Sequence, residues 1–422
     1  MNKNIGCGAG APQGGKGLET MKRAVCFSPL VRRLCALLAL GGLACLLCAC
    51  GAGAEDPGAE VALGSTDLLY EDGHVSGELC EGVVVDADIP DLSAVTSYDI
   101  VSAHLILPDE DVIQSMRDYV FAGRSEDEIQ YEYETAEDGK SKRYQLYYIG
   151  EATEETYYDR VLSVHSYPDS KYMSFSNFEA YPYERIGYSN DIPVSEDSLF
   201  GPFAEQRDLS FLPREEAVDA VRAQLAEWEI ETIGEPLVFC MDGEGMYQLL
   251  TELYDEKNRP PVPLDETRKE ELEYYYMVFD VGYQNIPYTR FDFQSKSSAL
   301  PGYGARVYVM YCAQGIVDLE YSWANYAIDG TLEEHDAAIT LDQAMSQVRT
   351  RYEDLVVTSA VEIENIFFQY VPAPWDETSG SCTFVPAWVF QPKTSMTVDG
   401  EVSEFYQKIV VVHAITGEVI SL

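Results

Sequence analysis

The chain is poor in histidine and lacks the sequence motifs of common catalytic and metal sites. It has five histidines among 422 residues, none at helical or CxxC-like spacing from another. It has no HExxH zinc motif, GxSxG nucleophile turn or Walker phosphate loop. Basic residues are scarce too, with 28 Lys and Arg against 72 Asp and Glu. These shortages argue against a histidine metal site and a bound cofactor, and the negative charge argues against nucleic acid as a partner.

One long apolar run, LCALLALGGLACLL at residues 34–47, lies near the N-terminus. It follows a basic segment and precedes small residues, and about 14 apolar residues are too few for a comfortable membrane span. The pattern predicts a secretory signal. Residues 1–20 form an unusually long, glycine-rich leader, so we expect Met21 to be the true initiator.

The signal ends on Leu47, Cys48, Ala49 and Cys50, which resembles the lipobox of bacterial lipoproteins. The resemblance implies cleavage before Cys50, thioether lipidation of its thiol, and a mature protein anchored by lipid on the extracytoplasmic face of a Gram-positive cell membrane. The alternative is an ordinary signal with a chance cysteine. In either case residues 1–49 are predicted to be a leader and signal peptide.

After the signal, residues 50–66 are small, polar and without periodicity, which predicts a flexible tether of about 20 to 25 Å reach. The first 49 residues hold six of the 28 basic side chains and one of the 72 acidic ones, so the remaining chain has 22 against 71. Such a surface repels nucleic acid and anionic lipid headgroups. It leaves open a cationic partner or a divalent metal, with a solvated acidic face as the simpler interpretation.

Four cysteines remain besides Cys50, an even number that permits disulfides in an exported chain. They lie far apart and form no CxxC pair, which argues against a metal site. Paired disulfides and buried free thiols both stay open for Cys80, Cys240, Cys312 and Cys382.

Residues 67–205 are predicted to form a β-rich N-terminal domain. Residues 82–90, GVVVDADIP, alternate as a strand and expose Asp86 and Asp88 on one face. These two carboxylates fit either a calcium site or a solvated strand face. Residues 108–123 predict a helix that stops at a glycine. Alternating tyrosines around Asp138 and Gly139 indicate a hairpin.

The second half contains two similar helices, residues 213–228 and 340–355, at a constant offset of 127. Their apolar steps of 3, 4 and 3 predict one buried face each. Strands follow both helices, and each set closes on a glycine hairpin. We therefore expect an α+β fold in which two tandem helix-plus-antiparallel-sheet units, 206–330 and 331–422, follow the N-terminal domain, with an insertion at about 251–272 in the first unit.

These motifs resemble a known group of proteins. The helix start at residues 340–344, the strand at 385–390 and the hairpin at 414–419 are similar to PepSY-type domains and to the YycH/YycI group of extracytoplasmic regulators. The whole mature chain also resembles an uncharacterised lipoprotein family of Gram-positive bacteria. The resemblance implies PepSY-like repeats and a regulatory role, and it carries over no catalytic residues.

The sequence therefore favours a non-catalytic binding or regulatory protein at the cell surface, with a protein or peptide partner. The alternative is a carboxylate-based enzyme or a solute or glycan receptor, because the many acidic residues could supply paired carboxylates. Trp323 and Trp375 are candidate ligand-binding aromatics, whereas Trp388 is predicted to lie in the core. His413 is predicted to be a packing or edge residue of the closing hairpin.

Overall fold

The computed structural model describes the chain in segments, and all structural statements below concern these residues: 68–135, 142–149, 159–166, 171–183, 201–253, 263–289, 305–322, 326–355, 359–376, 381–398 and 401–420. They form three antiparallel-dominated sheets of ten, eight and two strands. Within these segments no helix has the length and apolar character needed to cross a bilayer.

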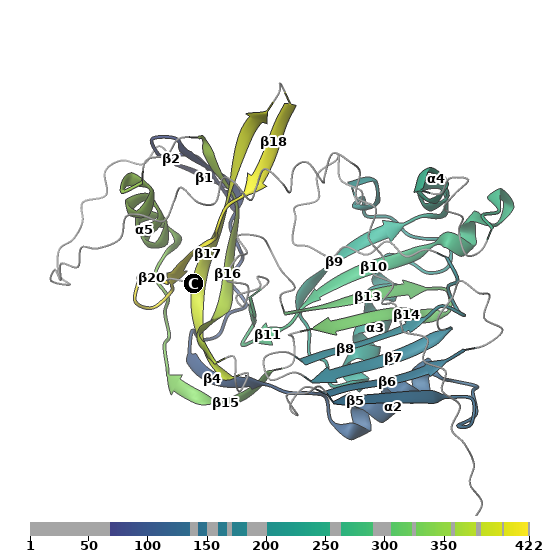
Figure 1. Cartoon of the computed structure of the whole chain (residues 1–422). Coiled ribbons are helices and arrows are strands. Elements are labelled where there is room, and N and C mark those ends of the chain that lie inside the picture. The colour runs from purple at the N-terminus through teal and green to yellow at the C-terminus, as the bar shows by residue number, and fades with distance from the viewer. Residues whose placement is uncertain are drawn as a thin grey trace, which may run out of the picture. The chain divides into compact units, whose positions relative to one another are not determined.

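The eight-stranded sheet is wholly antiparallel and combines two runs of four sequential strands (Figure 1). The runs join where β8 pairs with β14, and β5 and β9 form the two edges. The first run is β5 (Gln130–Thr135), β6 (Lys142–Tyr148), β7 (Arg160–Ser166) and β8 (Lys171–Asn177). The second is β9 (Ile233–Met241), β10 (Tyr274–Asp280), β13 (Arg306–Cys312) and β14 (Gly315–Ser322).

One face of this sheet is covered along its length by two helices, α2 (Glu110–Val120) and α3 (Arg214–Glu227). Tyr119 of α2 and Trp228 after α3 meet edge to face, with ring centroids 5.2 Å apart. The Tyr119 hydroxyl also accepts a hydrogen bond of 2.8 Å from the backbone N–H of Ile316. These contacts join the two strand runs on their helical side.

On the second face of the sheet, the helices among the described residues lie over β9, β10 and β13. There α4 (Gly243–Leu253) and the 3-10 helices η1 (Gly201–Phe203) and η2 (Glu266–Leu272) pack on residues such as Phe239, Tyr274 and Tyr276. Burial on both faces explains why β10 reads YYYMVF without alternation. Strands β6, β7, β8 and β14 alternate instead, with apolar residues towards α2 and α3.

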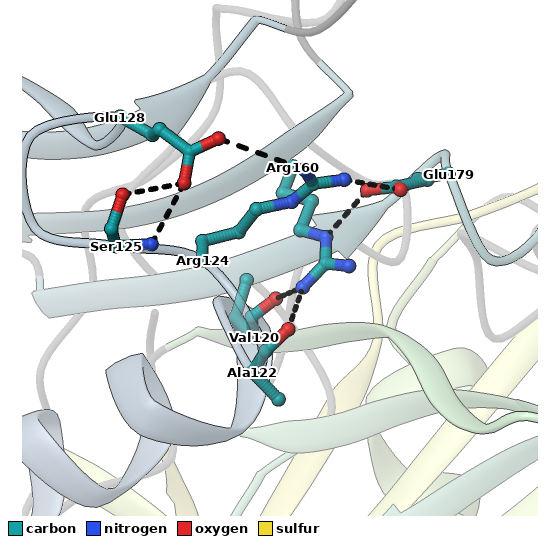
Figure 2. Close-up of polar contacts among 7 residues, drawn as sticks. All are labelled: Val120, Ala122, Arg124, Ser125, Glu128, Arg160 and Glu179. Carbon is teal, nitrogen blue, oxygen red and sulfur yellow. Dashed lines mark hydrogen bonds and ion pairs between the residues drawn. The ribbon is translucent and has the colours of Figure 1, made fainter.

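Arginines fix the end of α2 to this sheet (Figure 2). Arg160, at the start of β7, donates from Nη1 to the carbonyl oxygens of Val120 and Ala122, at 2.9 Å each, and from Nε to Glu179 at 2.9 Å. Arg124 donates to the same Glu179 carboxylate and lies 4.0 Å over the Tyr148 ring. Burial would raise the pKa of Glu179, but the hydrogen bonds and charges of the two arginines outweigh it and lower that pKa.

The ten-stranded sheet is built from both ends of the chain (Figure 1). Its main path runs from β1 (Leu69–Glu71) through β2 (His74–Cys80), β3 (Val83–Asp88), β16 (Val361–Asp376), β17 (Ser381–Val398) and β19 (Val410–His413) to β20 (Val419–Ile420). Three strands branch from it: β4 (Ile100–Leu105), β15 (Tyr326–Glu333) and β18 (Glu401–Tyr406).

Helix α5 (Leu341–Glu353) packs on the ten-stranded sheet and begins with the predicted capping box. The Thr340 hydroxyl accepts from the Gln343 N–H at 3.3 Å, and the Gln343 side chain accepts from the Thr340 N–H at 2.8 Å. Trp388 is buried as predicted, and its indole N–H donates to the Ile339 carbonyl at 3.1 Å.

A short hairpin contacts the segment before β4. Its strands, β11 (Gly282–Tyr283) and β12 (Ile286–Pro287), have two residues each. Its turn residues Gln284 and Asn285 both have positive φ, 52° and 62°, as a type I′ turn requires. Their side chains hold the turn in place, because Gln284 donates to Asp99 at 3.1 Å and Asn285 donates to the Ala94 carbonyl at 2.9 Å.

Several local predictions are confirmed. The helix expected at 108–123 is α2, which ends at Val120, and Gly123 has a φ of 78° in the turn that follows. The two helices offset by 127 are α3 and α5, and four aligned pairs are buried in both: Ala217, Val218, Val221 and Leu225 in the first, and Ala344, Met345, Val348 and Tyr352 in the second. The last pair differs, because Trp228 is buried and Leu355 is 53% exposed. Gly315 and Gly417 have positive φ in the two closing hairpins, as expected.

The predicted fold class is wrong. No β-rich N-terminal domain precedes two tandem helix-plus-sheet units, because strands from all three regions share the sheets. Strand β3 pairs in parallel with β16, β4 pairs with β15 and β17, and β8 pairs with β14. The physical reason is that hydrophobic periodicity reports which face of a strand is buried, while strand partners hundreds of residues away leave no local signal.

Candidate functional site

Polar side chains cross the eight-stranded sheet in one continuous row on the face opposite α2 and α3. Direct cross-strand neighbours link Glu320 on β14 to Ser174 on β8, Ser163 on β7, Gln145 on β6 and Glu132 on β5. We call these five residues, together with Asp318 and Ser176 beside them, the polar lane. Ser163 and Gln145 are buried and the rest of the lane is partly or fully exposed.

Two carboxyl groups lie on β14, at the end of the lane next to β13. Asp318 and Glu320 are two residues apart on β14 and therefore point to the same face. The Ser176 hydroxyl donates to Asp318 at 2.8 Å. Burial, with a further contribution from the charge of Asp318, raises the pKa of Glu320. A carboxyl group with a raised pKa beside a second carboxyl is a feature that functional sites share.

An aromatic wall bounds the lane on the side of β13. Tyr308, the cross-strand neighbour of Glu320, stacks with Tyr276 at a centroid distance of 6.4 Å and an interplanar angle of 29°. Both rings are buried, so they mark the end of the lane and are not exposed for a ligand to stack on. Beyond them Arg306 and Asp280 form an ion pair of 2.9 Å, with side chains only 6% and 18% exposed.

Arg143 and His165 lie beside the lane on the same face of the sheet. His165 on β7 lies between its neighbours Arg143 on β6 and Tyr172 on β8, and its ring meets that of Tyr172 edge to face at 5.3 Å. Arg143 donates to Gln145 of the lane. Burial, followed by the charge of Arg143, lowers the pKa of His165 and keeps its ring neutral at pH 7.

The lane thus presents hydroxyls, an amide and three carboxyls to one side of the sheet. Such groups accept and donate hydrogen bonds to hydroxyl- and amine-bearing molecules, and the carboxylates favour a cationic group. Within the described residues no group of three or more His, Cys, Asp or Glu is arranged to hold a metal ion. The arrangement suits the binding of a polar organic ligand.

Comparison with known proteins supports only the architecture. No protein-family model matches the sequence, and no curated protein matches it either. An uncharacterised protein from Eubacterium rectale ATCC 33656, with a crystal structure at 1.45 Å, aligns with a TM-score of 0.57 over 83% of this chain and 94% of that chain. The identity is 15%. The likeness lies in the fold alone.

The residues singled out from sequence lie away from the lane. Leu47, Cys48, Ala49, Cys50 and Trp323 fall outside the described segments. Trp375 belongs to β16 in the other large sheet, and its side chain is not among those described. The two tryptophans therefore remain untested as ligand contacts.

Other candidate groups have local structural roles. Among the described residues the four cysteines form no disulfide, with Cys240, Cys312 and Cys382 buried and Cys80 partly buried. His413 accepts at Nδ1 from the Ile415 N–H at 3.1 Å, so it orders the closing turn.

Asp86 and Asp88 occupy one exposed face of β3, as their alternation predicted. They contact His74 of the neighbouring strand at 2.7 and 2.9 Å. The hydrogen bonds to Asp88 and then Asp86 raise the pKa of His74. The histidine therefore satisfies both carboxylates that the sequence offered as calcium ligands.

Sequence analysis missed the lane because each member looks ordinary. Ser163, Ser174 and Glu320 are polar residues of alternating strands, and only the registers of β7, β8 and β14 bring them together. One signal was present. Strands β10 and β13 are apolar on both faces, whereas β6, β7, β8 and β14 alternate, and that contrast marks where the second face of a shared sheet becomes polar.

Proposed function

We propose that the chain is an exported lipoprotein, anchored in the membrane through Cys50, that binds a ligand at the cell surface without transforming it. The lane is the observation that carries this proposal. It is a sheet face with aligned hydroxyl, amide and carboxyl groups, while the described residues hold no arranged metal cluster.

The ligand class follows from the groups that the lane offers. Asp318 and Glu320 attract an ammonium or accept from hydroxyls, and Ser174 and Ser176 add short polar contacts. The chain has 72 acidic residues, which disfavours an anionic ligand. A hydroxyl- and amine-bearing wall fragment or a basic peptide meets these requirements.

The anchor is tested with Cys50→Ala. We expect this variant to leave the membrane fraction and to lose incorporation of a labelled fatty acid, because the thiol that carries the lipid is gone. Cys80→Ala is the matched control and should stay membrane-bound and labelled. Membrane retention of Cys50→Ala without lipid label would overturn the anchor.

The lane is tested with soluble peptidoglycan fragments as the probe. Wild-type protein should bind them in calorimetry, and Glu320→Gln should weaken binding by roughly 10- to 100-fold, because it removes a charge-assisted contact. Glu235→Gln, at a side chain 87% exposed on the opposite edge strand, should bind as wild type. Equal binding by all three proteins would exclude the lane as the site.

The raised pKa of Glu320 beside Asp318 favours one second candidate, a carboxylate-based glycoside hydrolase. Carboxyls on alternate residues of a strand lie about 7 Å apart, within the range of the acid and base in such enzymes. Release of reducing ends from the fragments, lost in Glu320→Gln, would establish the enzyme. Binding without release supports the receptor.

A further inference from the structure

Strand β5 is an edge strand with unusual exposure. All six residues of Gln130–Thr135 are exposed, and β5 pairs only with β6 among the described residues. Tyr131 and Tyr133 are 69% and 57% exposed, the highest values among the large hydrophobic side chains in the described segments. An edge of this kind presents free backbone N–H and C=O groups to any extended chain that reaches it.

The other edges with described side chains are protected against such pairing. At the opposite edge of the same sheet, β9 contains Pro236 and a positive-φ Gly234, and its register shifts against β10. In the ten-stranded sheet, β15 has two register shifts, and β1 and β20 have three and two residues. Strand β5 has no proline, glycine, lysine or register shift. Features that hinder pairing with another strand are thus present at β9 and absent from β5, which indicates that β5 is the edge able to pair with another chain.

The start of β5 is held in a fixed position (Figure 2). The Glu128 carboxylate accepts from the Ser125 N–H at 2.9 Å and from its hydroxyl at 2.6 Å, while the Glu128 N–H donates to the Ser125 carbonyl at 3.0 Å. Arg124, bound to Glu179, precedes this turn. The strand is thereby ordered before a partner arrives, which lowers the entropic cost of pairing.

A second copy of the chain is a poor partner for this edge. In a two-fold dimer, β5 would pair antiparallel with its copy and like faces of the two sheets would join. Every such register that pairs four or more residues of β5 places a glutamate opposite a glutamate, either Glu132 against itself or Glu132 against Glu134. Like charges directly opposite each other destabilise a strand pair.

We propose that β5 is the docking edge for an extended basic segment of a partner protein, which adds to the sheet as a ninth strand. Lysine or arginine on the segment lies opposite Glu132 and Glu134, and aliphatic or aromatic residues lie opposite Tyr131 and Tyr133. The net charge of −44 of the chain steers such a segment to the edge. Glu132 also belongs to the lane, but the proposed ligand end at Asp318 and Glu320 lies on β14, with β6, β7 and β8 between it and β5, so either proposal can fail alone.

The test uses the full chain and two labelled six-residue probes, one alternating lysine with valine and one alternating glutamate with valine. Wild-type protein should bind the lysine probe in preference. Glu132→Lys combined with Glu134→Lys should weaken binding of the lysine probe by roughly 2- to 30-fold, as expected for the loss of two cross-strand charge pairs. This double variant should bind the glutamate probe in preference. Glu227→Lys with Glu235→Lys changes the net charge equally, away from β5, and should keep the wild-type preference.

Amide hydrogen exchange supplies a readout that needs no variant. The lysine probe should slow exchange at residues 130–135 more than elsewhere in the wild-type chain. Unchanged exchange there would overturn the proposal, as would an equal loss of binding in both double variants. Concentration-dependent dimerisation of the wild type that Tyr133→Pro abolishes would instead assign the edge to a second copy.

Discussion

The two halves of the eight-stranded sheet differ in what covers their second face. Over β9, β10 and β13, α4 and the 3-10 helices bury residues such as Phe239 and Tyr276. Over β14, β8, β7 and β6 the described helices leave that face to the polar lane. The strand pairing is continuous across both halves. One half of the sheet therefore serves mainly stability, and the other half carries the polar lane that we propose for ligand binding.

The largest effect should come from the doubly covered half. Phe239→Ala removes a fully buried ring from the second face and should cost about 3–5 kcal/mol of unfolding free energy. Ser174→Ala, on the same face but at a partly exposed position of the lane, should change it by less than about 0.5 kcal/mol. Urea unfolding measures both. A similar loss in the two variants would remove the distinction between the halves.

The junction of the halves offers an intermediate effect. Gly315, at the β13–β14 turn, has φ of 99°, and a Cβ there would lie 2.7 Å from the Tyr119 hydroxyl. Gly315→Ala should therefore lower thermal stability, with a cost of about 1–3 kcal/mol. Gly330→Ala is the control, because a Cβ at that glycine meets no atom within 4 Å. Equal melting temperatures for the two variants would contradict the close approach of α2.

The smallest effect on the free energy of unfolding should be a stabilisation, in contrast to the two losses above. Since the fold raises the pKa of Glu320, ionising this group costs folding free energy. The cost is absent where the carboxyl is protonated in both states, below about pH 4, and it grows as pH rises towards the folded pKa. Glu320→Gln should therefore stabilise the chain at pH 7 by about 0.5–2 kcal/mol and leave it unchanged at low pH. A destabilised Glu320→Gln at pH 7 would show that the carboxylate is well solvated or paired.

Sequence reasoning succeeded where the signal is local. The buried face of α5 and its capping box follow from residues within one helix, and the alternation of β3 follows from six consecutive residues. It failed on the architecture, because nothing near Val83 indicates that its neighbour is Val361. The lane could not be predicted for the same reason, since Ser163 and Glu320 are linked through Ser174 only by the registers of strands far apart in sequence. The anchor at Cys50 stays a prediction.

The parallel pairing of β3 with β16 has a consequence for the order of folding. Residues 83–85 find their partners at 361–363, so β3 stays without this neighbour until nearly the whole chain has been made. Contacts of such long sequence separation form slowly, because a long loop must close before they contribute. The edge of β3 that faces β16 therefore stays without this partner until those residues have been made, and it is open to mispairing during that time.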